Sequence, residues 1–151
     1  MLKLILNKKY NPLFSSDARY FIITGGRGSG KSFAVTVFLT LLTMTKGIRI
    51  LFTRFTMTSA HLSIIPEFLE KIGLLGFDEV FNINKAEVVN TSNQSDILFR
   101  GIRTSAGNQT ASLKSLQGIS TWVLDEAEEL VDENIFDTID LSIREKNIHN
   151  R

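Results

Sequence analysis

Apolar runs and helical periodicities alternate along the chain, which predicts alternating strands and helices. A short apolar run at Tyr20–Thr24 ends in glycines and is typical of a buried strand. The next stretch, Lys31–Lys46, is apolar on nearly all sides and stops at Gly47, as a buried helix does. Ile48–Thr53 is a second strand-like run. A strand, a glycine turn, a helix and a strand in this order favour an α/β sheet over a helical bundle or a β-sandwich.

The rest of the chain continues this alternation. A helical pattern from Ser59 to Ile72 contains Pro66, so this helix is either kinked at the proline or begins just before it. Glu87–Asn90 and Asp96–Gly101 flank a polar segment and predict a hairpin. The apolar side of the proline-containing helix comprises Leu62, Ile65, Phe68, Leu69 and Ile72. The other expected elements are a surface loop at Arg103–Ser112, a strand at Ile119–Leu124 and a last helix opened by Asp132.

Composition places these elements in one domain without covalent cross-links. A chain of 151 residues, 43% of them hydrophobic, can bury a sizeable core. The absence of cysteine excludes disulfides, thiolate metal sites and cysteine nucleophiles. The formal net charge is +1, from 17 basic and 16 acidic residues, which argues against a polybasic nucleic-acid binder. Any nucleic acid would therefore be held by a local patch or by an assembly.

Two apolar stretches were candidates for export or membrane insertion, and neither has the required pattern. The stretch within residues 1–9 is too short for a secretory signal and is not followed by a small-residue cleavage site. The run from Phe33 to Met44 is interrupted by threonines and falls short of the ~20 residues that span a bilayer. We therefore expect a soluble, cytoplasmic protein that does not bind a membrane.

The segment Gly25–Ser32 fits the phosphate-loop pattern G-x-x-x-x-G-K-[ST], between a predicted strand and a predicted helix. Glycines let successive N–H groups turn toward a phosphate, and the helix N-terminus adds the positive end of its dipole. Lys31 is predicted to reach the β- and γ-phosphates, and the Ser32 hydroxyl to ligate Mg²⁺. The predicted nucleoside triphosphate site comprises Gly25, Gly26, Arg27, Gly28, Ser29, Gly30, Lys31 and Ser32.

Two carboxylates follow the apolar run that ends at Leu124. Asp125 is predicted to hold Mg²⁺, and Glu126, on the opposite side of the pleat, to orient and deprotonate the attacking water. A carboxylate beside the metal ligand favours ATP hydrolysis over phosphoryl transfer by a kinase, because a kinase must exclude water.

Several basic residues are candidates for contacts to phosphate groups of the nucleotide or of DNA. Arg27 either contacts the γ-phosphate as negative charge develops in the transition state, or points to solvent or to a neighbouring subunit. Candidates for an arginine or lysine finger, or for DNA phosphate contacts, are Arg54, Arg100, Arg103, Lys114 and Arg144. Each of these is individually more simply a surface charge.

These motifs resemble the ATPase domain of the large terminase subunit, the motor that packages DNA into tailed-bacteriophage heads. The G-G-R-G-S-G-K-S form of the loop at Gly25–Ser32 is common in that family. The run from Lys114 to Leu130, with its strand and two acids, is the more discriminating part. Arg54 after the second predicted strand and the segment Ile97–Ile102 also fit, so the resemblance covers most of the chain.

The resemblance implies an ATP-driven translocase of double-stranded DNA, working as a homo-oligomeric ring on a portal protein with a small subunit as recognition partner. It assigns phosphate and metal roles to Lys31 and Ser32, Mg²⁺ binding to Asp125 and the catalytic carboxylate to Glu126. The fold it implies is a phosphate-loop NTPase of the ASCE type, with a mainly parallel central sheet flanked by helices. A basic residue acting in trans is also expected, but no position matches firmly enough to name.

One departure from the family is large. Terminase large subunits continue into a coupling motif and a nuclease domain, so we expect residues 1–151 to be the N-terminal portion of the ATPase domain, incomplete at its C-terminal end and without a nuclease. In such ATPases a further strand inserts between the phosphate-loop strand and the acidic strand, so its absence would leave a central gap and a chain of low solubility or low Tm. Two alternatives stay open: a non-catalytic remnant that binds nucleotide, DNA or an intact terminase, and an unrelated phosphate-loop ATPase or kinase.

Overall fold

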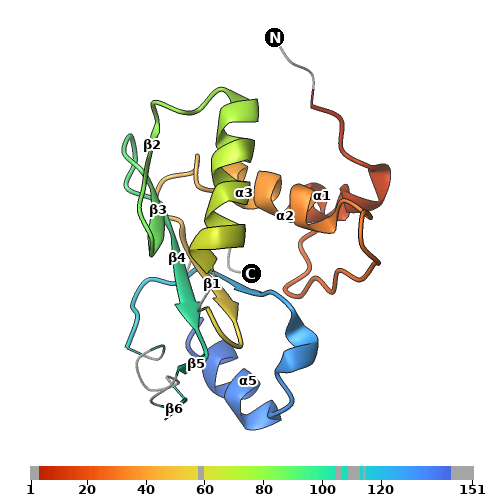
Figure 1. The fold of residues 1–151 in the computed structure, drawn as a ribbon, viewed down its shortest axis with the longest axis vertical. Coiled ribbons are helices and arrows are strands. Elements are labelled where there is room, and N and C mark those ends of the chain that lie inside the picture. The colour runs from red at the N-terminus through yellow and green to blue at the C-terminus, as the bar shows by residue number, and fades with distance from the viewer. Residues whose placement is uncertain (1–3, 58–59, 105–106, 109–112, 114, 144–151) are drawn as a thin grey trace.

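A five-stranded sheet forms the centre of the computed structural model, which describes residues 4–57, 60–104, 107–108, 113 and 115–143. β4 and β7 both lie parallel to β1, whereas β3 is antiparallel to both β2 and β4, so four of the five strands point the same way. The expected α/β fold with a mainly parallel sheet is confirmed (Figure 1). In spatial order the strands are β2 (Phe81–Ile83), β3 (Glu87–Asn90), β4 (Asp96–Gly101), β1 (Arg49–Arg54) and β7 (Thr121–Leu124).

Helices pack on both faces of this sheet. α2 (Lys31–Leu42) and α3 (Ala60–Leu75) cover one face, and α5 (Glu133–Asp140) covers the other. The smaller elements are the 3-10 turn η1 (Lys8–Tyr10), the helix α1 (Pro12–Ser15), the 3-10 turn η2 (Ala127–Glu129), and the two-stranded sheet β5 (Arg103–Thr104) and β6 (Gly107–Asn108).

Alternate residues of β1 enter two separate cores. Ile50 and Phe52 pack with α2 and α3, whereas Leu51 between them packs in the cluster that contains residues of α5. Successive side chains of a strand point to opposite faces, so a strand covered on both faces is apolar at nearly every position. This is the physical reason why a continuous apolar run predicts this strand correctly.

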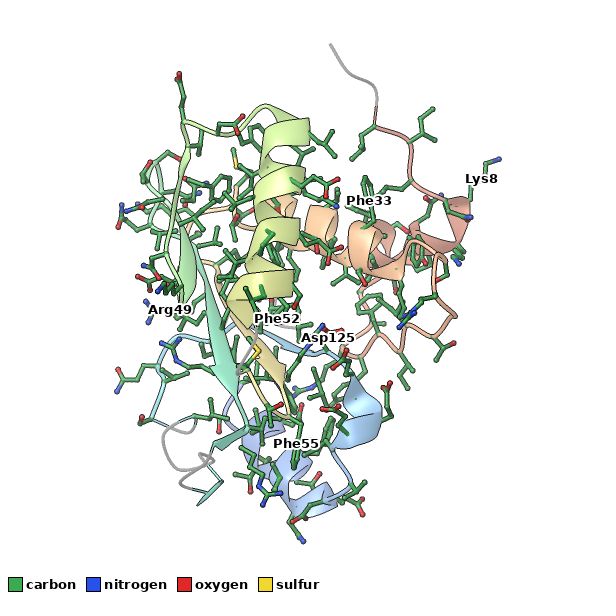
Figure 2. The ribbon with its side chains drawn as sticks, viewed as in Figure 1. Lys8, Phe33, Arg49, Phe52, Phe55 and Asp125 are labelled. Atoms are coloured by element: carbon green, nitrogen blue, oxygen red, sulfur yellow. The ribbon has the colours of Figure 1, made fainter. Side chains whose placement is uncertain are left out.

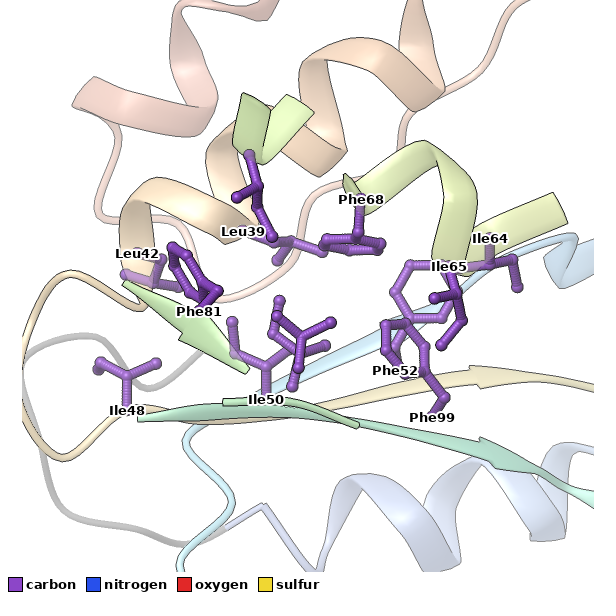
Figure 3. Close-up of a cluster of buried hydrophobic side chains, with 13 residues drawn as sticks. Leu39, Leu42, Ile48, Ile50, Phe52, Ile64, Ile65, Phe68, Phe81 and Phe99 are labelled. Atoms are coloured by element: carbon purple, nitrogen blue, oxygen red, sulfur yellow. The ribbon is translucent and has the colours of Figure 1, made fainter. Parts of the chain in front are cut away.

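Three aromatic rings pack together in the core beneath α3. Phe52 of β1, Phe68 of α3 and Phe99 of β4 lie with ring centroids 5.3 to 6.0 Å apart (Figure 3). Two of the three pairs meet edge to face, the arrangement that the aromatic quadrupole favours. Phe68 is fully buried, so these contacts anchor α3 to the centre of the sheet.

The structure settles the course of the proline-containing helix. α3 begins at Ala60 and runs through Pro66 to Leu75. Its predicted apolar side is only partly right: Phe68 is buried, but Leu62 and Leu69 are 73% and 49% exposed, and Ile64 is buried in their place. The sheet contacts a narrower stripe of the helix than the apolar pattern suggests.

Several other sequence predictions are confirmed, and the structure adds detail to one more. The predicted hairpin is formed by β3 and β4, with the expected bounds. Asp132 caps α5, because its carboxylate accepts a hydrogen bond from the amide of Asn134. The segment Arg103–Ser112, expected to be a surface loop, contains the short paired strands β5 and β6, while residues 105–106 and 109–112 lie outside the described part of the chain.

The predicted strand at Tyr20–Thr24 is the main correction to the fold. This segment has no strand assignment, and Ile22 and Tyr20 are 90% and 57% exposed, so the prediction of a buried strand is wrong. A strand needs a neighbour to complete its hydrogen-bond ladder. Among the described strands β7 pairs with β1 alone, and residues 20–24 and β7 line the same open cleft.

Candidate functional site

The segment Gly25–Ser32 turns the chain into α2. Gly30 precedes the helix with a φ of +78°, a left-handed conformation that glycine adopts without a steric penalty. At Gly25, φ is +156° and a Cβ atom would lie 2.9 Å from Oγ of Ser29, so a side chain there is excluded by both backbone and space. The first turn of α2 has no side-chain cap and no acidic residue. Gly25, Gly28 and Gly30 of the predicted phosphate loop all have a positive φ, which favours glycine at these three positions.

Two side-chain hydrogen bonds help to hold this loop in shape. Lys31 Nζ donates to the carbonyl of Gly25 at 2.8 Å, which folds the lysine back over the turn. The hydroxyl of Tyr10, a buried residue of η1, donates to the carbonyl of Ser29 at 2.9 Å. Ser29 Oγ is buried without a hydrogen-bond partner. Sequence reasoning missed the contact of Tyr10, because the polar segment around it, Asn7–Asn11, matches no pattern that indicates a partner 19 residues away.

The acidic pair follows β7 directly. The amide of Asp125 donates to the carbonyl of Thr53 at 2.9 Å and so extends the ladder between β7 and β1 by one residue. Trp122 Nε1 donates to Thr53 Oγ1, which in turn donates to the carbonyl of Val123. These bonds fix the register in which β1 and β7 end, and Asp125 is placed at the carboxyl edge of the sheet (Figure 2).

Arg54, the last residue of β1, contacts both acids. Its Nε and Nη2 atoms each lie 2.7 Å from Oδ2 of Asp125, and Nη2 lies 3.6 Å from Oε1 of Glu126. The exposed fractions of the three side chains are 23% for Arg54, 32% for Asp125 and 46% for Glu126. Among the finger candidates, Arg54 is therefore not a surface charge but part of the acidic site.

Glu126 departs from its predicted direction. Its φ and ψ of 54° and 48° are left-handed, which costs a non-glycine residue about 1–2 kcal/mol. The expectation that Glu126 points to the opposite side of the pleat from Asp125 is wrong, because the chain turns at Glu126 and both carboxylates reach one guanidinium. Strained left-handed residues are found disproportionately at functional sites.

One cleft of about 1140 Å³ brings most of these residues together. Lys31 and Ser32 from the start of α2 line it, as do Arg54, Asp125 and Glu126. The glycines and Ser29 of the loop and Arg27 are not among its lining residues. Arg27 itself is exposed, which leaves its two predicted roles open.

The comparison with protein families decides the family of this chain. A model of the phage terminase large subunit family matches residues 17–151. The chain belongs to the phage terminase large subunit family. No curated protein matches the chain.

Membership gives this terminase chain a role in phage DNA packaging. Terminase large subunits are in general ATPases that use a nucleotide and Mg²⁺, and they act with DNA, a small subunit and a portal protein. The α/β sheet described above is consistent with the ATPase fold of this family. In the part of the chain that the structure describes, no helix has the length and apolar character of a membrane span.

Two of the remaining finger candidates, Arg100 and Arg103, are not among the residues that line the cleft. Arg100 donates to the carbonyls of Ala86 and Phe99, and the guanidinium of Arg103 lies 5.9 Å from the centre of the Phe55 ring. Lys114 and Arg144 fall outside the described residues.

Proposed function

We propose that this chain is the ATP-binding and ATP-hydrolysing part of a terminase large subunit, which powers translocation of double-stranded DNA into the procapsid. The observation that carries the proposal is that Lys31, Ser32, Asp125 and Glu126 line the same cleft. A phosphate-binding helix start and a pair of carboxylates in one cleft are the parts that phosphoryl transfer requires.

The triphosphate would lie against the turn at Gly25–Ser32. The uncapped first turn of α2 offers free N–H groups and the positive end of a 12-residue helix, both of which favour an anion. Lys31 donates to the carbonyl of Gly25, and a phosphate would be a stronger acceptor for its ammonium group. Arg27 is proposed to contact the γ-phosphate from the exposed side of the same turn.

Mg²⁺ would be held by Asp125 and Ser32 together with the phosphates. Among the described residues, no group of three or more His, Cys, Asp or Glu side chains converges as a metal site. This donor set suits Mg²⁺, which proteins usually bind through one or two side chains plus substrate phosphates rather than in a complete protein cage. When bound, the cation neutralises charge on the phosphates.

Glu126 is proposed to accept a proton from the attacking water. It lies beside the proposed metal ligand and is the most exposed of the three charged side chains at the end of the strands, so water has access to it. A positioned general base typically contributes 10²–10⁴-fold to a rate. The proposed partners are double-stranded DNA of any sequence, contacted mainly at phosphates, the small subunit, the portal and further copies in a ring, within the host cytoplasm.

One observation favours the alternative of a nucleotide-binding chain that does not turn over by itself. Residues 20–24, which lead into the loop, are not hydrogen-bonded into the sheet as a strand. A phosphate loop without a strand before it lacks the backbone hydrogen bonds that a sheet would supply. Nucleotide binding without turnover in the isolated chain would favour this alternative over the proposed ATPase.

Steady-state ATP turnover with and without double-stranded DNA tests the proposal. Lys31→Ala should abolish nucleotide binding and turnover, whereas Glu126→Gln should abolish turnover and spare binding. Stimulation by DNA, lost at high salt, would support the motor role. Wild-type protein that neither binds nor hydrolyses ATP would refute both functions.

A further inference from the structure

Three basic residues line the cleft, and only one of them contacts the acidic pair in the part of the chain that the structure describes. Arg19 pairs with Asp140, and Lys31 donates to the carbonyl of Gly25. Arg54 alone lies within 4 Å of both Asp125 and Glu126. One guanidinium therefore balances two neighbouring carboxylates.

Backbone bonds on both sides hold Arg54 in this place. The amide of Ile102 donates to the carbonyl of Arg54 at 2.9 Å, and the neighbouring carbonyl of Thr53 accepts from Asp125. The guanidinium is planar and approaches Oδ2 of Asp125 with two nitrogens, a geometry that a lysine ammonium cannot reproduce. Arg54 is thus positioned by the sheet and orients Asp125 in turn.

We propose that Arg54 is a positioning residue and the resident counter-ion of the acidic pair, and that it competes with divalent cations for Asp125. This inference deepens the proposed function and rests on it. While Arg54 occupies Oδ2, the pair has a low affinity for a bare divalent cation. A cation gains enough further ligands to displace Arg54 from Asp125 only when a triphosphate lies in the same cleft. Arg54 therefore couples metal binding to nucleotide binding.

Removing the guanidinium should tighten the binding of a bare cation. Arg54→Gln leaves two adjacent carboxylates without their positive partner and removes the repulsion between Arg54 and the incoming cation. A unit charge about 5 Å from a divalent ion changes its affinity by about tenfold even at the dielectric constant of water. The expected change is therefore a tenfold lower Kd, opposite in sign to the loss that a damaged site would show.

The test measures Mn²⁺ binding to the nucleotide-free 151-residue chain from the electron paramagnetic resonance signal of the free ion. Arg54→Gln should lower the Kd about tenfold, and adding Asp125→Asn to it should abolish this gain. Arg19→Gln is the matched control, because it removes the other paired arginine of the cleft and should leave the Kd unchanged. Arg54→Met, which keeps the aliphatic stem, provides a second variant if the glutamine form does not fold.

An Arg54 variant that folds and binds Mn²⁺ no more tightly than wild type overturns the inference, and so does an equal gain in Arg19→Gln. The proposed function is judged separately, by binding of a fluorescent ATP analogue to wild type and to Lys31→Ala. If Arg54→Gln gives no gain in Mn²⁺ affinity while the ATP analogue still binds wild type and not Lys31→Ala, the role of Arg54 alone is refuted. If Arg54→Gln binds Mn²⁺ more tightly but wild type does not bind the ATP analogue, nucleotide binding is refuted and the competition between Arg54 and the cation for Asp125 is supported.

Discussion

The hydroxyl of Tyr10 donates a hydrogen bond to the carbonyl of Ser29, 19 residues further along the chain. The turn that leads into α2 is thereby supported from the N-terminal segment, although no strand supports it from the sheet. The packing of Tyr10 with Leu13 and Ala34 buries this contact.

Tyr10→Phe tests how much this support matters. Loss of one hydrogen bond to a part-buried carbonyl should cost about 1 kcal/mol of stability and weaken nucleotide binding, because the loop loses one of its supports. Urea unfolding and titration with a fluorescent ATP analogue measure the two effects. Tyr20→Phe is the control, since it removes an exposed hydroxyl that donates to Asp140 and accepts from Arg19 Nε at the surface. Equal effects of the two substitutions would refute a special role for Tyr10.

The left-handed backbone at Glu126 predicts a difference between two substitutions that both delete the carboxylate. Glu126→Gly should give a protein about 1 kcal/mol more stable than Glu126→Ala, because only alanine keeps the strain of a positive φ. Thermal unfolding of the two variants measures the difference. Both should lack ATP turnover. An alanine variant as stable as the glycine variant would show that Glu126 is not strained in solution.

The aromatic core predicts a large and local cost of truncation. Phe68→Ala should destabilise the protein by about 3–5 kcal/mol, because it leaves a cavity between α3 and the sheet. Leu69→Ala on the adjacent, half-exposed position should cost less than about 1 kcal/mol. Chemical denaturation of both variants gives the comparison. Similar costs at the two positions would mean that α3 does not pack as described.

The other end of the parallel strands carries an ion pair with a defined pH dependence. Arg49 forms three hydrogen bonds of 2.9–3.2 Å with the buried Asp96, which raise the pKa of Arg49. A raised pKa of a basic group gives stability that is present below the unfolded pKa and is lost only as pH rises through the folded one. The contribution should therefore be constant from pH 6 to about 10.

Arg49→Gln should cost about 1–3 kcal/mol at every pH in this range, because it leaves a buried carboxylate with fewer donors. Unfolding at pH 7 and at about pH 10 measures it. Arg100→Gln is the control and should cost less, because the guanidinium of Arg100 donates to the backbone carbonyls of Ala86 and Phe99. A loss of stability that is smaller at about pH 10 than at pH 7 would contradict the assignment of the effect to Arg49.

Local signals were enough to predict much of the fold. The two-sided apolar run predicts β1, the polar turn between alternating residues predicts the β3–β4 hairpin, and Asp132 predicts the start of α5. The residues of the cleft that belong to Gly25–Ser32 and the acidic pair were predictable for the same reason. Their spacing is short, and turn, cap and strand preferences act between residues close in sequence.

Contacts between distant segments decided the rest. Arg54 and Asp125 are 71 residues apart, so no local pattern distinguishes this arginine from an exposed one. The direction of Glu126 depends on the turn into η2 and on the same guanidinium. The segment at 20–24 has the composition of a strand, but strand formation depends on a neighbouring strand, and that is a property of the assembled sheet. The sequence by itself determined the local elements and the chemical groups, whereas the tertiary structure decided which groups meet, because hydrogen bonds and ion pairs require positions that only the folded chain supplies.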